Sequence, residues 1–183
     1  MFKIQNPIIK IHEPFAKFLG NPQELVDFEI SLYDAARLSG HLCPSVAGAF
    51  LITKKAIEIL YPEDHVCQRG DLEVYLPGRP DEAAFGPIAN VISFITGAWN
   101  ETGFGGLRGE FSRRNLLHFS TTPCIVRNFI FVRRETRATV TIHFDPGPAL
   151  QRAKTNQRSS SFEESWQANI AAVLNANDLI TCV

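Results

Sequence analysis

Residues 39–44, Ser-Gly-His-Leu-Cys-Pro, separate two segments in which apolar residues recur at helical spacing. Gly40 is a common helix terminator, and Pro44 fits the first position of the next helix, where its missing N–H is not needed. The stretch therefore predicts a helix, a short break and a second helix. A histidine and a cysteine two positions apart at such a break can direct their side chains to one point.

The pair His41 and Cys43 is the part of the sequence best suited to chemistry. Imidazole and thiolate are ligands of zinc, iron and copper, and together they also serve as a thiol nucleophile and its base. The first N–H groups of the second helix would face Cys43 and stabilise a thiolate. The spacing leaves open the alternative that Cys43 is a small buried hydrophobic residue and His41 a helix cap.

The two helices around the break extend in both directions. Asn21 and Pro22 provide a cap and a first-turn proline for a helix that we expect to continue to Leu38. The second helix is expected to start at Pro44 and to end before Pro62. Both segments are amphipathic, so each should bury one face.

The second half of the chain changes to the alternating pattern of strands. Strands are predicted at 71–76, 115–119, 128–134 and 138–144, with a hairpin between the last two, and helices at 87–99 and 162–175. Helices first and antiparallel strands later indicate an α+β fold, with N-terminal helices and a mostly antiparallel sheet. Residues 1–20 are interpreted as a loosely structured arm, 21–183 as one domain, and the polar stretch 154–161 as mobile.

Composition narrows the function classes. The chain has 183 residues, 45% of them hydrophobic, and a formal net charge of −1, which is typical of a globular domain and gives no general attraction to nucleic acid or to a membrane surface. We see no signal peptide and no membrane span, and the four scattered cysteines are expected to be free thiols in a reducing cytoplasm.

A glycine-rich segment at 103–109 is a second candidate site. Glycines let the backbone approach a ligand, and arginines donate pairs of hydrogen bonds to phosphate or carboxylate groups. The segment matches neither a Walker loop nor a dinucleotide-binding fingerprint, and a flexible connection is the alternative interpretation. The candidate cofactor-binding residues are Gly105, Gly106, Arg108, Arg114 and Asn115.

A second His-x-Cys pair, His65 and Cys67, follows the second predicted helix. A helix of about 17 residues is roughly 25 Å long, so the two pairs should lie at its opposite ends and cannot share one ion within one chain. We interpret His65 and Cys67 as part of a surface loop.

Residues 39–44, followed by Ser-Val-Ala-Gly-Ala-Phe at 45–50, resemble the FmdE-like family of formylmethanofuran dehydrogenase proteins, whose pattern at the same break is His-Gly-His-x-Cys-Pro-Gly. The resemblance continues at 90–97 and 114–117, and covers about Tyr33 to Phe144. It implies an α+β domain that is usually a homodimer and that binds a transition metal, commonly zinc. On this chain the metal ligands would be His41 and Cys43.

This chain departs from the family pattern at several ligand positions. Ala98 stands where the family has a cysteine, no cysteine occurs near Phe85, Ser39 replaces the first histidine, and the zinc ribbon of some members is absent. Zinc takes three or four protein ligands. The missing ligands would come from Glu101, His118, a partner chain or a small molecule.

Three functions follow from these observations. The first is a metal- or metal-cofactor-binding protein that holds its ligand through His41 and Cys43. The second is a haem-binding protein that uses the same residues, because Cys-Pro is a known context for a haem-ligating thiolate. The third is a metal-free enzyme with Cys43 as nucleophile, His41 as base and the 103–114 segment as an anion cradle.

Overall fold

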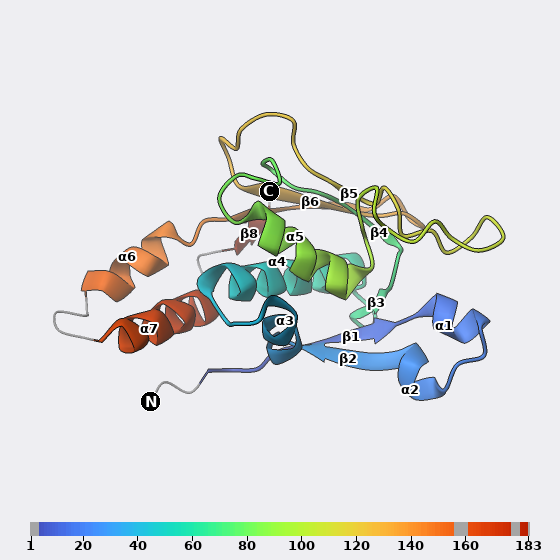
Figure 1. The fold of residues 1–183 in the computed structure, drawn as a ribbon, viewed down its shortest axis with the longest axis horizontal. Helices are drawn as coiled ribbons and strands as arrows, with labels where there is room; N and C mark the ends of the chain where they lie inside the picture. The colour runs from blue at the N-terminus through green and yellow to red at the C-terminus, as the bar shows by residue number, and fades with distance from the viewer. Residues whose placement is uncertain (1–3, 156–160, 177–179, 183) are drawn as a thin grey trace.

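The long helix α4 (Pro44–Leu60) lies at the centre of the molecule, between two sheets (Figure 1). The structure is a computed structural model that describes residues 4–155, 161–176 and 180–182. The other helices are α1 (Pro14–Phe18), α2 (Gln23–Val26), α3 (Leu32–Ser39), α5 (Phe85–Thr96), α6 (Gly147–Thr155) and α7 (Phe162–Asn175). The strands are β1 (Ile8–His12), β2 (Asp27–Ser31), β3 (Val66–Gln68), β4 (Leu72–Tyr75), β5 (Leu117–His118), β6 (Asn128–Arg133), β7 (Thr139–Phe144) and β8 (Ile180–Cys182).

Both sheets contain parallel and antiparallel pairs. The smaller sheet has the order β2-β1-β3, with β1 antiparallel to β2 and parallel to β3. The larger sheet has the order β5-β4-β6-β7-β8, and β4 and β5 are its parallel pair. The α+β class predicted from the sequence is confirmed. The strands, however, form two mixed sheets instead of one mostly antiparallel sheet, because β3 and β5 return beside their neighbours in the same direction.

The N-terminal segment is not a loose arm, contrary to the prediction. Residues 8–12 form β1, the middle strand of the smaller sheet, and α1 follows directly (Figure 1). Ile9 and Ile11 point into the core and are almost completely buried. The two prolines of this segment lie outside the strand, so they do not interrupt its pairing.

The single helix predicted from Pro22 to Leu38 is also wrong. The segment divides into α2, the strand β2 and α3. The backbone of β2 pairs with β1, and this pairing overrides the helical spacing of the apolar residues. A capping box then starts α3: the Ser31 hydroxyl accepts the Asp34 N–H at 3.2 Å, and the Asp34 carboxylate accepts the Ser31 N–H at 2.9 Å.

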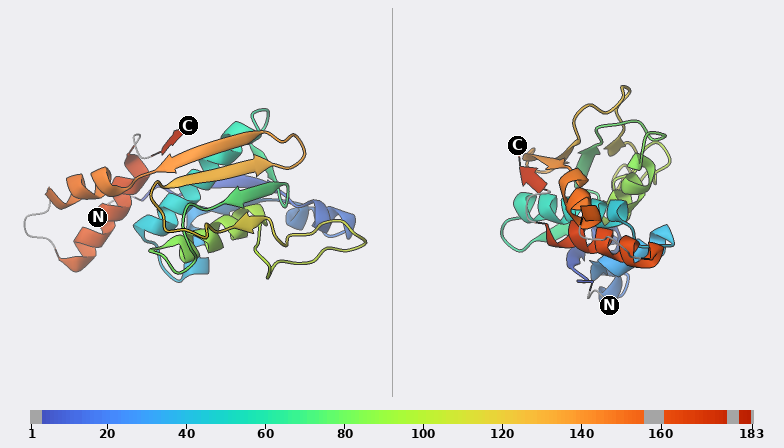
Figure 2. Two further views of the ribbon diagram at one scale, coloured as in Figure 1. Left: turned by 90° about the horizontal axis from the view of Figure 1, so that it is seen from above. Right: turned by 90° about the vertical axis from the view of Figure 1, so that its left-hand side faces the viewer.

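Several other elements agree with the sequence. The predictions of α4, α7, β4 and the β6–β7 hairpin are confirmed to within a few residues, whereas α6, β3 and β8 were not predicted. Most of the stretch 154–161, predicted to be mobile, lies outside the described residues. The left view of Figure 2 shows α6 and α7 beyond one end of the β6–β7 hairpin. None of the helices in the described part combines the length and apolar character needed to cross a bilayer.

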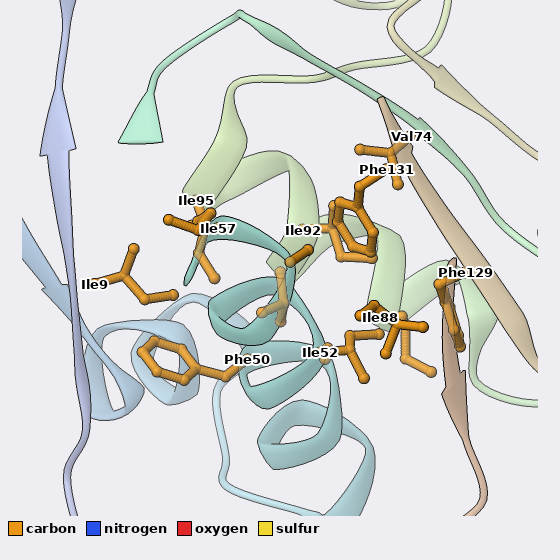
Figure 3. Packing of buried hydrophobic residues seen from close by; sticks show 14 of the residues in the cluster. Ile9, Phe50, Ile52, Ile57, Val74, Ile88, Ile92, Ile95, Phe129 and Phe131 are labelled. Atoms are coloured by element: carbon orange, nitrogen blue, oxygen red, sulfur yellow. The ribbon is translucent and has the colours of Figure 1, made fainter. Parts of the chain in front are cut away.

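The core lies on both sides of α4 (Figure 3). Phe50 is near Ile9 of the smaller sheet, whereas Ile52 lies toward α5 and the larger sheet. Large side chains such as Phe50 and Phe129 are fully buried, and each contributes about 1.5–3 kcal/mol by leaving water. This packing fixes the N-terminal end of α4, where Cys43 lies.

Candidate functional site

The break between α3 and α4 forms as the sequence predicts. Gly40 ends α3 in the left-handed conformation, with φ of 75°. Cys43 is the N-cap of α4, and its Sγ accepts the backbone N–H of Val46 at 3.4 Å. Pro44 occupies the first turn of the helix. The thiol therefore lies at the positive end of a long helix, where a negative charge is stabilised.

His41 lies on the surface beside this helix start. Its Nδ1 is 3.0 Å from the carbonyl oxygen of Ser39. When Nδ1 carries the proton and donates to this carbonyl, the lone pair of Nε2 is left for a ligand. Within the described part of the chain, the imidazole makes no hydrogen bond with Cys43 Sγ, so the nucleophile–base pair of a thiol enzyme is not formed in this conformation.

The C-terminal helix holds the segment between these two residues. Trp166 of α7 donates its indole Nε1–H to the carbonyl oxygen of Leu42 at 3.0 Å. No local motif predicts this contact, because the two residues are 124 positions apart. The break is thus held by a helix near the C-terminus.

A cavity of about 320 Å³ opens at the start of α4. Its lining comes from the starts of α4 and α5, from β6 and β7 and from α6, and most of it is apolar. The lining residues are Pro44, Ser45, Ala83, Ala84, Phe85, Ile88, Arg127, Phe129, Phe144, Pro146 and Leu150. Two of them, Ile88 and Phe129, lie close together in Figure 3. The volume is in the range of small-molecule sites.

Two glycines make room for the aromatic walls of this cavity. A Cβ atom on Gly48 of α4 would lie 2.2 Å from Cζ of Phe144, and one on Gly78 would lie 2.2 Å from Cε2 of Phe85. Any larger residue would push these rings from their positions. The sequence pattern gave no indication of this role, since glycine inside a helix usually only weakens it.

The cavity has a positively charged rim. Arg127 is the one charged residue in its lining, and no carboxylate among the described residues lies within ion-pair distance of the guanidinium. Ser45 lies in the first turn of α4, and within the described part its backbone N–H has no hydrogen-bond partner. A guanidinium and a helix N-terminus both favour a negatively charged group. Arg127, Ser45 and Gly48 were not among the predicted site residues.

The described residues do not complete a metal site around His41 and Cys43. Among them, no group of three or more histidine, cysteine, aspartate or glutamate residues could hold an ion. His118 instead bonds the Glu73 carboxylate, with 2.9 Å between Nε2 and Oε1, and Glu101 is exposed beyond the end of α5. A resident zinc ion therefore does not fit the described side chains alone, because two protein ligands are too few.

The other ligand positions of the family pattern are also separated. Phe85 begins α5 and lines the cavity, whereas Ala98 follows the other end of the same helix. A helix of 12 residues is roughly 18 Å long. Cysteines at both positions could not reach one ion together with Cys43 in this fold.

The second pair, His65 and Cys67, lies at the far end of α4, as the helix length predicts. The interpretation of both as a surface loop is wrong for Cys67, which lies in β3 and is completely buried. Burial raises the pKa of the Cys67 thiol to about 12. This residue is a small hydrophobic core residue at neutral pH.

The glycine-rich segment forms a small hairpin instead of an open loop. Leu107 and Glu110 exchange two backbone hydrogen bonds of 2.9 and 3.0 Å, with Arg108 and Gly109 at the turn. Both turn residues have positive φ, which suits this tight hairpin. Arg108 is exposed at the tip.

The other predicted cofactor-binding residues pack against the hairpin itself. A Cβ on Gly106 would lie 2.4 Å from the carbonyl oxygen of Glu110, and Arg114 lies over Gly105. Arg114 donates Nε–H to the carbonyl oxygen of Gly103 at 3.2 Å. Asn115 has positive φ and donates its N–H to Asn100. Their role as an anion cradle stays a prediction.

No protein-family model, curated protein or solved structure matches this chain.

Proposed function

We propose that this protein binds a small molecule with an apolar body and a carboxylate group in the cavity at the start of α4. The observation that carries the proposal is an apolar cavity of about 320 Å³ whose lining includes both Arg127 and the N-terminal residues of α4. Apolar lining with a few converging polar groups is the usual character of a ligand site.

The two parts of the ligand have different roles. Apolar surface that leaves water contributes roughly 25 cal/mol per Å², so the body of the ligand provides most of the affinity. An exposed ion pair with Arg127 adds only ~0–1 kcal/mol. The charged rim therefore orients the ligand and distinguishes a carboxylate from a neutral compound of the same shape.

Titration with matched compounds tests this proposal. A panel of aliphatic and aromatic carboxylates is compared with the corresponding alcohols by calorimetry. The carboxylates are expected to bind more tightly, and Arg127→Gln to weaken their binding about three- to fivefold while leaving the alcohols unchanged. Leu150→Trp, which puts a larger side chain on the cavity wall, should weaken both classes.

The matched control is Arg137→Gln, because Arg137 is an exposed arginine outside the cavity lining. This variant should bind the carboxylates like the wild type. The proposal fails when no compound of either class binds, or when Leu150→Trp has no effect on binding.

The second candidate is metal binding, in which a metal ion bridges the protein and this ligand. The Nδ1 contact of His41 with the Ser39 carbonyl favours it, because metal-binding histidines commonly donate their other ring N–H to such an acceptor. Cys43 would supply the thiolate, and the carboxylate of the ligand would supply the missing coordination. Kinship with the FmdE-like family belongs to the same proposal. It is supported by the motif at 39–44 and by the segments at 44–45 and 83–85 lining one cavity, whereas the position of Ala98, beyond the other end of α5, counts against it.

Zinc titration distinguishes the two candidates. The metal proposal expects zinc to bind the wild type, to bind more tightly when the carboxylate is present, and to be lost in His41→Ala and Cys43→Ala. Cys182→Ala is the control, because this exposed cysteine is not at the site. Metal analysis and an absorbance scan of the purified protein test for a metal ion and for haem. Carboxylate binding that is independent of zinc and of Cys43 leaves only the first candidate.

A further inference from the structure

A second cluster of charged residues lies at the opposite end of α5 from the cavity. The Glu13 carboxylate bridges two arginines: Arg69 donates from Nη1 at 3.2 Å, and Arg113 donates from Nη2. Arg69 also donates from Nη2 to the carbonyl oxygen of Phe94 at 2.9 Å. The cluster therefore joins the cap of α1, the segment after β3 and the end of the glycine-rich hairpin.

Two glycines allow the Arg113 side chain to be buried. Arg113 is only 8% exposed. A Cβ on Gly70 would lie 1.9 Å from Nη1 of Arg113, and one on Gly97 would lie 2.8 Å from it. Both glycines have positive φ, so their backbone also disfavours any other residue. The guanidinium position is thus determined by the surrounding backbone.

Positive charge exceeds negative charge in this cluster. Arg134 joins it by donating from Nη1 to the carbonyl oxygen of Gly70 at 2.9 Å. The nearby Asp71 carboxylate is engaged elsewhere, since it accepts from Arg133 Nε at 3.2 Å. Arg133 also pairs with Glu135, so the four arginines of this region exceed its three carboxylates by one, and only Arg69 and Arg113 pair with Glu13.

Some of the buried donors lack acceptors. Within the described part of the chain, Nε of Arg69 and Nη1 of Arg113 are buried without a hydrogen-bond partner. Buried polar groups nearly always have one, from protein, water or a ligand. Burial and the neighbouring Arg69 charge lower the pKa of Arg113, and the Glu13 carboxylate only partly offsets this.

A pocket of about 180 Å³ opens among the residues of this cluster. It is lined by Arg69, Arg113 and Arg134, by Ser112 and Asp71, and by Pro14, Gly70 and Phe111. We propose that this pocket binds a doubly charged phosphate-type oxyanion, either as the free ion or as the ester group of a small organic molecule. An oxyanion would offset the excess positive charge of the cluster, and guanidinium groups suit phosphate because they donate pairs of parallel hydrogen bonds.

Calorimetric titration of the whole protein with inorganic phosphate, in chloride buffer of matched ionic strength, tests the proposal. Saturable binding is expected, and nitrate, a single-charge oxyanion, should bind at least about fivefold more weakly. Arg134→Gln removes the most exposed of the three arginines, and phosphate binding should weaken about tenfold or more. Phenyl phosphate identifies the source: tighter binding than phosphate indicates an organic ester, and equal binding indicates the free ion.

Two control variants make the result specific. Arg137→Gln removes another exposed arginine of the β6–β7 turn, and Arg127→Gln removes the arginine of the α4 cavity. Both should bind phosphate within about twofold of the wild type, since neither residue lines this pocket. The proposal is overturned when the wild type shows no saturable phosphate binding, when Arg134→Gln binds as the wild type does, or when all three variants lose affinity equally.

Discussion

Gly48 controls the shape of the α4 cavity, because the Phe144 ring occupies the space where a side chain would lie. In Gly48→Ala two effects compete. Alanine is favoured over glycine in a helix by about 1 kcal/mol, whereas forcing a methyl group into a packed core costs about 1–3 kcal/mol. A separation of only 2.2 Å between the new Cβ and Cζ of Phe144 cannot be relieved without moving the ring, so we expect a net destabilisation of about 1 kcal/mol or more. Urea unfolding measures it.

The control for this substitution is Gly105→Ala. A Cβ at Gly105 would meet nothing closer than 3.6 Å, so its free energy of unfolding should change by less than about 0.5 kcal/mol. Gly48→Ala should also weaken carboxylate binding, since the displaced Phe144 ring lines the cavity. A stabilised Gly48→Ala protein would show that the ring moves away freely, contrary to this expectation.

Cys67 gives the protein a specific sensitivity to alkaline pH. Burial raises the pKa of Cys67 to about 12 in the folded state, whereas an unfolded thiol titrates near 8.5. As pH rises, the unfolded chain therefore loses this proton first. The contribution of the Cys67 thiol to the free energy of unfolding is fully present below pH ~8.5 and is lost as pH rises toward 12. By pH ~10 the loss amounts to about 2 kcal/mol. Burial also raises the pKa of Tyr61, which extends the decline to higher pH.

Urea unfolding at several pH values between ~8 and ~10 measures this effect. The free energy of unfolding should fall more steeply with pH in the wild type than in Cys67→Ala, even though the variant is less stable at neutral pH. The exposed Cys182 serves as the comparison, because Cys182→Ala should keep the wild-type slope. If the free energy of unfolding falls equally steeply with pH in the wild type and in Cys67→Ala, Cys67 is not the source of the alkaline sensitivity.

The strand β1 is an integral part of the core, and its two faces make this testable. Ile11 is 1% exposed, and Ile8 on the same strand is 42% exposed. Ile11→Ala should lower the free energy of unfolding by about 2–5 kcal/mol because it leaves a cavity, whereas Ile8→Ala should cost less than about 1 kcal/mol. Chemical denaturation of both variants provides the measurement. Similar small losses in both would indicate that β1 does not pack as described.

The sequence predicts an element well when local and tertiary preferences agree. The helix α4 has a cap, a first-turn proline and an apolar face, and its bounds were predicted almost to the residue. Residues 23–39 show the opposite case: the apolar spacing is helical, but 27–31 pairs with β1. The partner strand lay in a segment interpreted as a loose arm, so the pairing could not be foreseen. The acidic and apolar alternation of Asp27-Phe28-Glu29-Ile30 was the one local indication of a strand.

The candidate sites depend on contacts between distant parts of the chain, and this explains which of their residues could be predicted. His41 and Cys43 stand in one short motif, and the break that exposes them is present. The cavity at the start of α4 also needs α5, β6, β7 and α6, which meet only in the folded molecule. In the second cluster, the ion pairs of Glu13 with Arg69 and with Arg113 join residues that are 56 and 100 positions apart in the sequence. Burial of the Arg113 side chain also requires Gly70 and Gly97, and no short sequence motif contains these glycines together with Arg113.

The contact between α7 and the His41–Cys43 break couples the C-terminal helix to the candidate site. In Trp166→Phe an aromatic ring remains, but the indole N–H that bonds the Leu42 carbonyl is lost. Such a hydrogen bond contributes ~1 kcal/mol, so local opening of the break should become about fivefold more frequent. Alkylation of Cys43, followed by peptide mass spectrometry under native conditions, should accelerate by about this factor.

The same digest contains its own reference, because Cys182 is exposed and far along the chain from the break. Its alkylation rate should be unchanged in Trp166→Phe. Phe162→Leu is the matched variant: Phe162 stacks on Trp166 with 5.7 Å between ring centroids, but it is 80% exposed and makes no hydrogen bond to the break. It should leave the Cys43 rate within about twofold of the wild type. An acceleration in Phe162→Leu equal to that in Trp166→Phe would assign the effect to loss of α7 packing, and an unchanged Cys43 rate in Trp166→Phe would show that the hydrogen bond does not hold the break closed.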